Sequence, residues 1–221
     1  MSFPRKRESS IILFKSNEVK VVKKLWAIPL IFLLAGCGSF GAGRNIVPVL
    51  SPDMTYLQHT KGVAMTKNNI SVVAVYLQDV KELDGFGVMI VNETPNWISL
   101  KKEECILVQN GQAIKPLKDS KALSRLGAGY KPSMPDELTA DIYEWRREVN
   151  LKSSRGKKTI DTKVIDEDKK MSIITGSRET IFLYFSTQGS TAPMQLIIPN
   201  IYNETTKERT SFSFGFVLEK K

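Results

Sequence analysis

Residues able to carry out chemistry are scarce in this chain. Its 221 residues include a single histidine, His59, and two cysteines, Cys37 and Cys105. A nucleophilic serine or cysteine needs a base beside it, and a zinc site needs a cluster of cysteine and histidine ligands. The sequence offers neither arrangement, so we expect no catalytic residues, no metal site and no cofactor. Cys105 lies in an apolar stretch and is expected to be a buried, unreactive thiol.

Two groups of carboxylates remain as candidates for acid–base or metal chemistry. Glu103 and Glu104 begin a stretch predicted to be a strand, where successive side chains point to opposite faces, so the two cannot cooperate. Asp166, Glu167 and Asp168 lie among lysines and lack the glycine turn of a calcium-binding loop. Neither group is expected to form a site, and the chain is expected not to be an enzyme.

Cys37 stands out by its position in the chain. It follows an uncharged, mostly aliphatic run, Leu25–Ala35, which is preceded by Lys23 and Lys24. A helix needs about 20 apolar residues to span a bilayer, so this run is too short. It has the length of the apolar part of a secretory signal, with a positive flank in the usual place. A buried helix with Cys37 in the core is the other interpretation.

The end of the run, Leu34-Ala35-Gly36-Cys37, resembles the lipobox of bacterial lipoproteins. The resemblance implies cleavage between Gly36 and Cys37 and attachment of lipid to the Cys37 thiol. It also implies anchoring at the outer membrane in a diderm host, on its periplasmic or surface face, or at the outer face of the cell membrane in a monoderm. One acyl chain binds only marginally, so durable anchoring needs two or three. Residues 1–36 are then a signal peptide, and residues 1–20 are interpreted as an over-extended gene start.

Removal of the signal peptide would lower the net charge of the chain. The whole chain has a net charge of +9, but the first 36 residues hold seven basic and two acidic residues, which leaves +4. A charge of this size gives weak attraction to anionic surfaces and says little about specificity. We expect the membrane to be a partner through the N-terminal lipid, and we expect no nucleic-acid partner.

The remaining chain has the patterns of an all-β domain. Apolar, β-branched runs alternate with turn signals, among them Asn110-Gly111, and Phe212, Phe214 and Phe216 alternate with small residues. The prediction is an antiparallel β-sandwich of seven to nine strands over residues 61–221, after a lipidated cysteine and tether at 37–60 that contains His59. The segments "VNET" and "FSFGFVL" are similar to immunoglobulin-like domains of bacterial lipoproteins, which implies that type of sandwich. An up-and-down barrel is the alternative.

One region departs from the β pattern. Residues 117–170 are predicted to be an insertion, helical near 119–149 and then charged and solvated. Within it, Leu138, Ile142, Trp145 and Val149 recur at the spacing of one helical face.

The insertion is the predicted recognition region, because loops and insertions carry function more often than strands. Tyr143, Trp145, Arg146 and Arg147 are the candidate partner-binding residues, since these types are enriched in binding hot spots. Trp145 also lies on the apolar face, where it would anchor the helix instead. The expected function is that of a non-catalytic envelope lipoprotein that binds or helps assemble another envelope component. The alternative is a lipoprotein that binds a small ligand or polysaccharide through exposed aromatic residues such as Trp97 or Tyr130.

Overall fold

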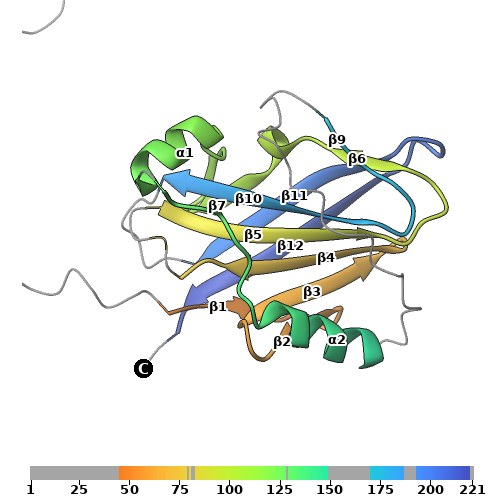
Figure 1. Ribbon diagram of the computed structural model, residues 1–221, viewed down its shortest axis with the longest axis horizontal. Coiled ribbons are helices and arrows are strands. Elements are labelled where there is room, and N and C mark those ends of the chain that lie inside the picture. Colours follow the sequence, from red (N-terminus) through yellow and green to blue (C-terminus); the bar gives the residue numbers. More distant parts are fainter. Residues whose placement is uncertain are drawn as a thin grey trace, which may run out of the picture. The chain divides into compact units, whose positions relative to one another are not determined.

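The computed structural model describes residues 45–78, 80, 83–127, 129–148, 170–186 and 193–219. These residues form twelve strands in two antiparallel sheets, with two α-helices and one short 3-10 helix (Figure 1). The predicted β-sandwich with a helical insertion is therefore confirmed; the immunoglobulin-like type stays a prediction. No helix in the described part of the chain is long and apolar enough to cross a bilayer.

The smaller sheet has five strands in the order β10–β5–β4–β3–β2. They are β2 (Met54–Leu57), β3 (Gly62–Lys67), β4 (Ile70–Tyr76), β5 (Leu83–Asn92) and β10 (Arg178–Ser186). The larger sheet has the order β1–β12–β11–β6–β9, and β7 pairs with β11 and with β8. Its strands are β1 (Ile46–Val49), β6 (Ile98–Leu100), β7 (Ile106–Gln109), β8 (Gln112–Ile114), β9 (Met171–Ile173), β11 (Met194–Asn203) and β12 (Arg209–Leu218).

Two tight hairpins are fixed by asparagine and glycine at positive φ. Asn110 and Gly111, at φ 52° and 75°, join β7 to β8, as the sequence predicts. Asn68 and Asn69, at φ 52° and 58°, join β3 to β4 in the same way. Two-residue turns of this kind match the right-handed twist of the flanking strands, so they set the pairing register of both hairpins.

The main core lies between the two sheets. Phe212, Phe214 and Phe216 all point inward from β12, while the alternate residues of that strand are partly or fully exposed, which confirms the predicted alternation. Phe86 from the smaller sheet meets Phe216 with ring centres 5.1 Å apart. Aromatic contacts of this geometry add to the stabilisation from burial itself.

The insertion covers the outer face of the smaller sheet. Helix α1 (Asp119–Leu126) and helix α2 (Leu138–Glu148) each pack against it through a separate apolar cluster (Figure 1). Leu138, Ile142 and Trp145 of α2 are buried as the spacing predicts, whereas Val149 lies outside the described residues. This cover explains why β4 and β5 are buried on both faces.

A glycine allows the segment between the helices to lie close to the sheet. A Cβ atom on Gly87 of β5 would overlap the sulfur of Met134, which packs on the sheet between α1 and α2. The absence of a side chain at Gly87 therefore makes room for Met134, which is the kind of close approach that glycine in a strand often marks.

The structure differs from the sequence predictions at three places. Residues 45–60, expected to be tether, contain β1 and β2, so the described domain begins at Asn45 rather than at residue 61. The sequence predicts seven to nine strands, and the described residues form twelve, because several strands are only three or four residues long and carry too few alternating positions to be predicted. Glu103 and Glu104 belong to the 3-10 helix η1 (Lys102–Glu104) rather than to a strand. Residues 151–169 of the expected loop lie outside the described part.

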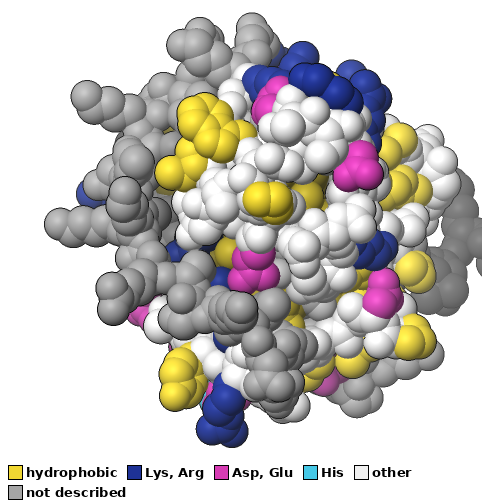
Figure 2. Space-filling model, turned by 90° about the vertical axis from the view of Figure 1, so that its right-hand side faces the viewer, with side chains coloured by type: hydrophobic (Ala, Val, Ile, Leu, Met, Phe, Trp, Pro, Cys, Tyr) yellow, Lys and Arg dark blue, Asp and Glu magenta, His cyan; other side chains and the backbone are white. Residues whose placement is uncertain are grey.

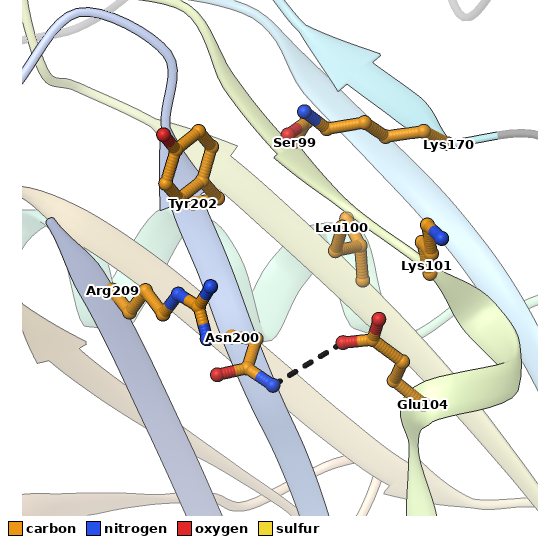
Figure 3. A pocket seen from close by; sticks show the side chains of 8 residues that line it. All are labelled: Ser99, Leu100, Lys101, Glu104, Lys170, Asn200, Tyr202 and Arg209. Carbon is orange, nitrogen blue, oxygen red and sulfur yellow. Dashed lines mark hydrogen bonds between the residues drawn. The ribbon is translucent and has the colours of Figure 1, made fainter. Parts of the chain in front are cut away.

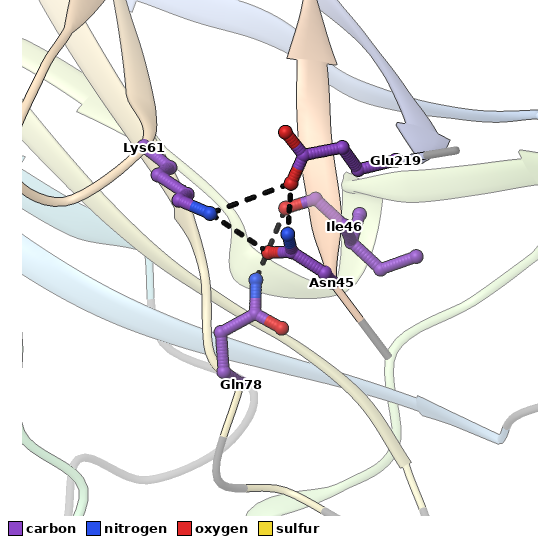
Figure 4. A network of polar contacts seen from close by, with 5 residues as sticks. All are labelled: Asn45, Ile46, Lys61, Gln78 and Glu219. Atoms are coloured by element: carbon purple, nitrogen blue, oxygen red, sulfur yellow. Dashed lines mark hydrogen bonds and ion pairs between the residues drawn. The ribbon is translucent and has the colours of Figure 1, made fainter. Parts of the chain in front are cut away.

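A polar network fastens the first described residue to the end of the domain (Figure 4). Asn45 and Glu219 are joined by a side-chain hydrogen bond, and the Glu219 N–H donates to the Asn45 carbonyl at 2.8 Å. The Lys61 ammonium donates to Asn45 Oδ1 at 3.1 Å and lies 3.4 Å from the Glu219 carboxylate. The Gln78 amide donates to the Ile46 carbonyl at 3.0 Å. These contacts fix the place where the chain enters the sandwich.

Candidate functional site

The outer face of the larger sheet presents a row of three polar side chains. In β6, Ile98 and Leu100 point into the core, so Ser99 points to the outer face of the sheet, where it is covered and bonded to Glu204. Tyr202 of β11 is the register partner of Ser99 on one side and of Arg209 in β12 on the other. Directly opposed residues in antiparallel strands have Cβ atoms about 5 Å apart. The register therefore lines up a hydroxyl, an aromatic ring and a guanidinium on one face of the sheet.

This row forms part of a small pocket (Figure 3). The pocket is lined by Ser99, Leu100, Lys101, Glu104, Lys170, Asn200, Tyr202 and Arg209. Its volume is about 220 Å³. Sites for drug-sized ligands start at about 300 Å³, so this pocket suits a single ring or a small charged group.

A break in the pairing of β11 shapes the pocket. The register with β12 shifts between Ile198 and Ile201, and Asn200 in the break has a φ of 55°. Such bulges turn side chains out of the regular alternation and are common next to functional sites. The Asn200 side-chain amide donates to Glu104 at 3.2 Å, which links the break to the 3-10 helix (Figure 3).

Three cations surround the Tyr202 ring. The Lys170 and Lys207 ammonium groups lie 5.0 and 5.6 Å from the ring centre, and the Arg209 guanidinium carbon lies 6.0 Å from it. The negative face of an aromatic ring attracts cations at this range. Figure 2 shows basic side chains gathered along one edge of the end of the domain where β11 turns into β12.

One carboxylate balances part of this charge. Glu204 forms an ion pair with Lys170 and accepts a hydrogen bond from the Ser99 hydroxyl at 2.5 Å. The bond from Lys170 and then that from Ser99 hold the pKa of Glu204 below its usual value. Glu204 is thus a fixed negative charge that positions Lys170 and Ser99.

A second polar cluster joins α2 to the turn before β3. His59, Asp141 and Glu144 have potential metal-ligand atoms within 4.8 Å of one another. The buried Asp141 carboxylate already accepts the N–H groups of His59 at 2.9 Å and Thr60 at 2.8 Å, and the Thr60 hydroxyl at 2.6 Å. Asp141 therefore has a structural task, which is to hold the turn against the helix. His59, expected in a flexible tether, is fixed at this junction.

The predicted partner-binding residues divide between surface and core. Tyr143 has 71% of its surface exposed and Arg147 is also exposed, so both remain accessible. Trp145 is only 3% exposed and packs on the smaller sheet, which supports the interpretation as an anchor over that as a partner contact. Arg146 is half-buried and lies 3.3 Å from Glu93 in an ion pair.

The structure tests the prediction for one of the two cysteines. Gly36 and Cys37 lie outside the described residues, so cleavage and lipidation stay predictions. Cys105 is fully buried as expected, and burial raises the pKa of its thiol to about 12.

The two aromatic residues predicted to contact a ligand differ in exposure. Trp97 has 57% of its surface exposed just before β6. Tyr130 is half-buried in the apolar cluster that holds α1 on the smaller sheet, away from the pocket.

The pocket residues Ser99, Asn200, Tyr202 and Arg209 were missed by sequence reasoning. The signal that could have found one of them is Pro199-Asn200, a pair of turn-forming residues inside an otherwise continuous strand pattern. The row itself could not be found, because it depends on the register of strands that lie far apart in the chain.

Comparisons with known proteins give little further information. No model of a known protein family matches the chain, and no characterised protein matches it in sequence. A protein of unknown function from Listeria monocytogenes EGD-e has a similar solved structure. The match has 9% identity and a TM-score of 0.37, and it covers 80% of this chain and 89% of that chain. A likeness this distant carries no argument about function.

Proposed function

We propose that this chain is a lipid-anchored envelope protein that binds another envelope component without catalysing a reaction. The anchor is proposed from the Leu34–Cys37 motif and the apolar run before it. The binding role is carried by one observation, the basic pocket around Tyr202 on the outer face of the larger sheet. The outer membrane is the proposed location in a diderm host.

The pocket and the first described residue lie at opposite ends of β12. Asn45 lies beside Glu219 at one end of β12, and the pocket residue Arg209 begins the other end of that strand. At about 3.3 Å per residue the two ends are about 30 Å apart.

The described residues also support a role without catalysis. The Cys105 thiol stays protonated at neutral pH because burial raises its pKa to about 12, and a thiol in that form is a poor nucleophile. His59, the sole histidine of the chain, lies 3.7 Å from Glu144 on the far side of the smaller sheet from the pocket. The group beside the Ser99 hydroxyl is the Glu204 carboxylate, and the bonds from Lys170 and Ser99 that hold its pKa below the usual value make it a weak base.

A protein partner docking on α2 is a second candidate function. It is favoured by the exposure of Tyr143 and Arg147 on the outward face of the helix. Aromatic and arginine residues supply much of the energy in protein interfaces. In this case cross-linking in cells would recover a protein whose capture is lost in Tyr143→Ala and retained in Arg209→Gln.

The proposed function is tested by fractionation and cross-linking in a bacterial host. The wild-type chain should sediment with membranes, and its mass should show a mature N-terminus at Cys37 carrying acyl chains. Cys37→Ser should remain unprocessed and carry no lipid. If Cys37→Ser keeps the mass and processing of the wild type, the anchor is refuted. If binding to the envelope is equal in wild type and Arg209→Gln, the role of the pocket is refuted.

A further inference from the structure

We infer that the pocket on the larger sheet binds a sugar ring that carries an anionic group, such as a carboxylate or a phosphate. This inference rests on the proposed function for its setting, because acidic polysaccharides are envelope components. It names the chemistry of the bound component, which the proposed function leaves open. Three features of the pocket carry it: surplus positive charge, exposed aromatic surface and size.

The first feature is the balance of charge. Four cations, Lys101, Lys170, Lys207 and Arg209, stand against two carboxylates, Glu104 and Glu204. Glu204 is engaged by Lys170 and Ser99, and Glu104 accepts a hydrogen bond from Asn200.

Arg209 is the cation best placed to receive an anion. Among the described residues, the guanidinium makes no ion pair or hydrogen bond, and its neighbour in the structure is the Tyr202 ring. A guanidinium offers a planar fork of donors that matches the two oxygens of a carboxylate or phosphate. The two lysines within 6 Å of the same ring add to the positive potential at that place.

The second feature is aromatic surface in the pocket and near it. Trp97 has 57% of its surface exposed, and its carbonyl accepts the N–H of Glu204 at 2.9 Å, so it lies beside the end of β11. Tyr202, which is partly exposed, supplies the ring that lines the pocket itself. The apolar C–H faces of sugars pack on such rings, whereas a small inorganic anion would gain nothing from them.

The third feature is size and place. A volume of about 220 Å³ is smaller than that of sites for drug-sized ligands and suits one sugar ring, either free or as one unit of a longer chain. The pocket lies at the opposite end of β12 from Asn45, the first described residue. A sugar unit of an acidic polymer satisfies all three features, and the vesicle measurement in the test distinguishes it from an anionic lipid head group.

The inference is tested by calorimetry on the full chain in detergent, with tetragalacturonate as the carboxylate probe and its methyl ester as the matched neutral probe. Glucose 6-phosphate against glucose tests the phosphate form. We expect the anionic probe of at least one pair to bind, its neutral partner to bind at least tenfold more weakly, and affinity to fall as salt is raised. Arg209→Gln and Tyr202→Leu should each weaken binding about tenfold or more.

Two variants with the same kinds of substitution elsewhere on the surface serve as controls. Arg147→Gln and Tyr143→Leu change the same residue types on the exposed face of α2, and they should leave affinity unchanged. Unaltered circular dichroism of every variant shows that the fold is kept. The inference is overturned if neither anionic probe binds at millimolar concentration, or if the ester binds as well as the acid. It is also overturned if Arg209→Gln abolishes binding to phosphatidylglycerol vesicles alone. A failed Cys37→Ser experiment would refute the anchor and leave this result untouched.

Discussion

Replacing Trp145 by alanine tests whether the insertion serves the fold or a partner. Trp145 is 3% exposed and packs with Leu138 and Ile142 of α2 against the outer face of the smaller sheet. Tyr143, two residues earlier on the same helix, is 71% exposed. The two positions share a helix and a similar side chain, so they differ mainly in what they contact.

The expected loss follows from burial. An aromatic side chain of this kind buries about 200 Å², and at about 25 cal/mol per Å² this corresponds to at most about 5 kcal/mol. Truncation of buried aromatic residues costs about 3–5 kcal/mol. We expect Trp145→Ala to lower the free energy of unfolding by about 4 kcal/mol, and Tyr143→Ala to change it by less than about 0.5 kcal/mol. The gain in helix propensity on going to alanine is similar at both positions, so it cancels in the comparison.

Urea unfolding of the full chain, followed by circular dichroism, measures the difference. With a slope of about 2 kcal/mol per M, the midpoint of Trp145→Ala should fall by about 2 M with an unchanged slope. Trp145→Phe should fall less, because most of the apolar contact remains. A loss below about 1 kcal/mol in Trp145→Ala, or an equal loss in Tyr143→Ala, would refute the assignment of Trp145 as the anchor of α2.

Two further substitutions and the native Cys105 thiol probe buried polar groups. Asp141→Ala should lower the free energy of unfolding by about 3 kcal/mol, because the N–H groups of His59 and Thr60 lose their acceptor; an unchanged urea midpoint would contradict this. Gln109→Met should raise it by about 1 kcal/mol, since the side-chain amide is 1% exposed and has no hydrogen-bond partner among the described residues; a loss of stability would show that the amide is bonded. The Cys105 thiol should resist iodoacetamide at pH 8 until the protein unfolds. Stability should then decline from about pH 9 towards about pH 12, because the unfolded thiol loses its proton first; rapid native-state alkylation would contradict the assignment.

The elements that sequence reasoning found are those with a strong local signal. The period-2 alternation of Phe212, Phe214 and Phe216 predicted β12, and Asn110-Gly111 predicted the hairpin of β7 and β8. The spacing of Leu138, Ile142 and Trp145 predicted the buried face of α2. Each signal depends on residues a few positions apart, so the chain itself displays it.

The parts that sequence reasoning missed depend on distant neighbours. β1 has only four residues and includes Pro48, and it is a strand because it pairs with the edge of β12. Ser99 and Glu204 meet although 105 residues separate them, because β6 pairs with the end of β11. Pairing partners and register leave no local trace in one sequence, so neither the early start of the domain nor the pocket could be predicted from it.

The insertion covers the outer face of the smaller sheet, and this limits the experiments that can test its role. Val73, Val75 and Met89 of the smaller sheet face α2, so deletion of residues 117–170 would expose a continuous apolar surface. Surfaces of that kind promote aggregation. Loss of a partner in such a deletion would therefore report on solubility and not on docking. Point changes at Tyr143 and Arg209 avoid this ambiguity, because each alters one outward-facing side chain and leaves the cover of the sheet in place.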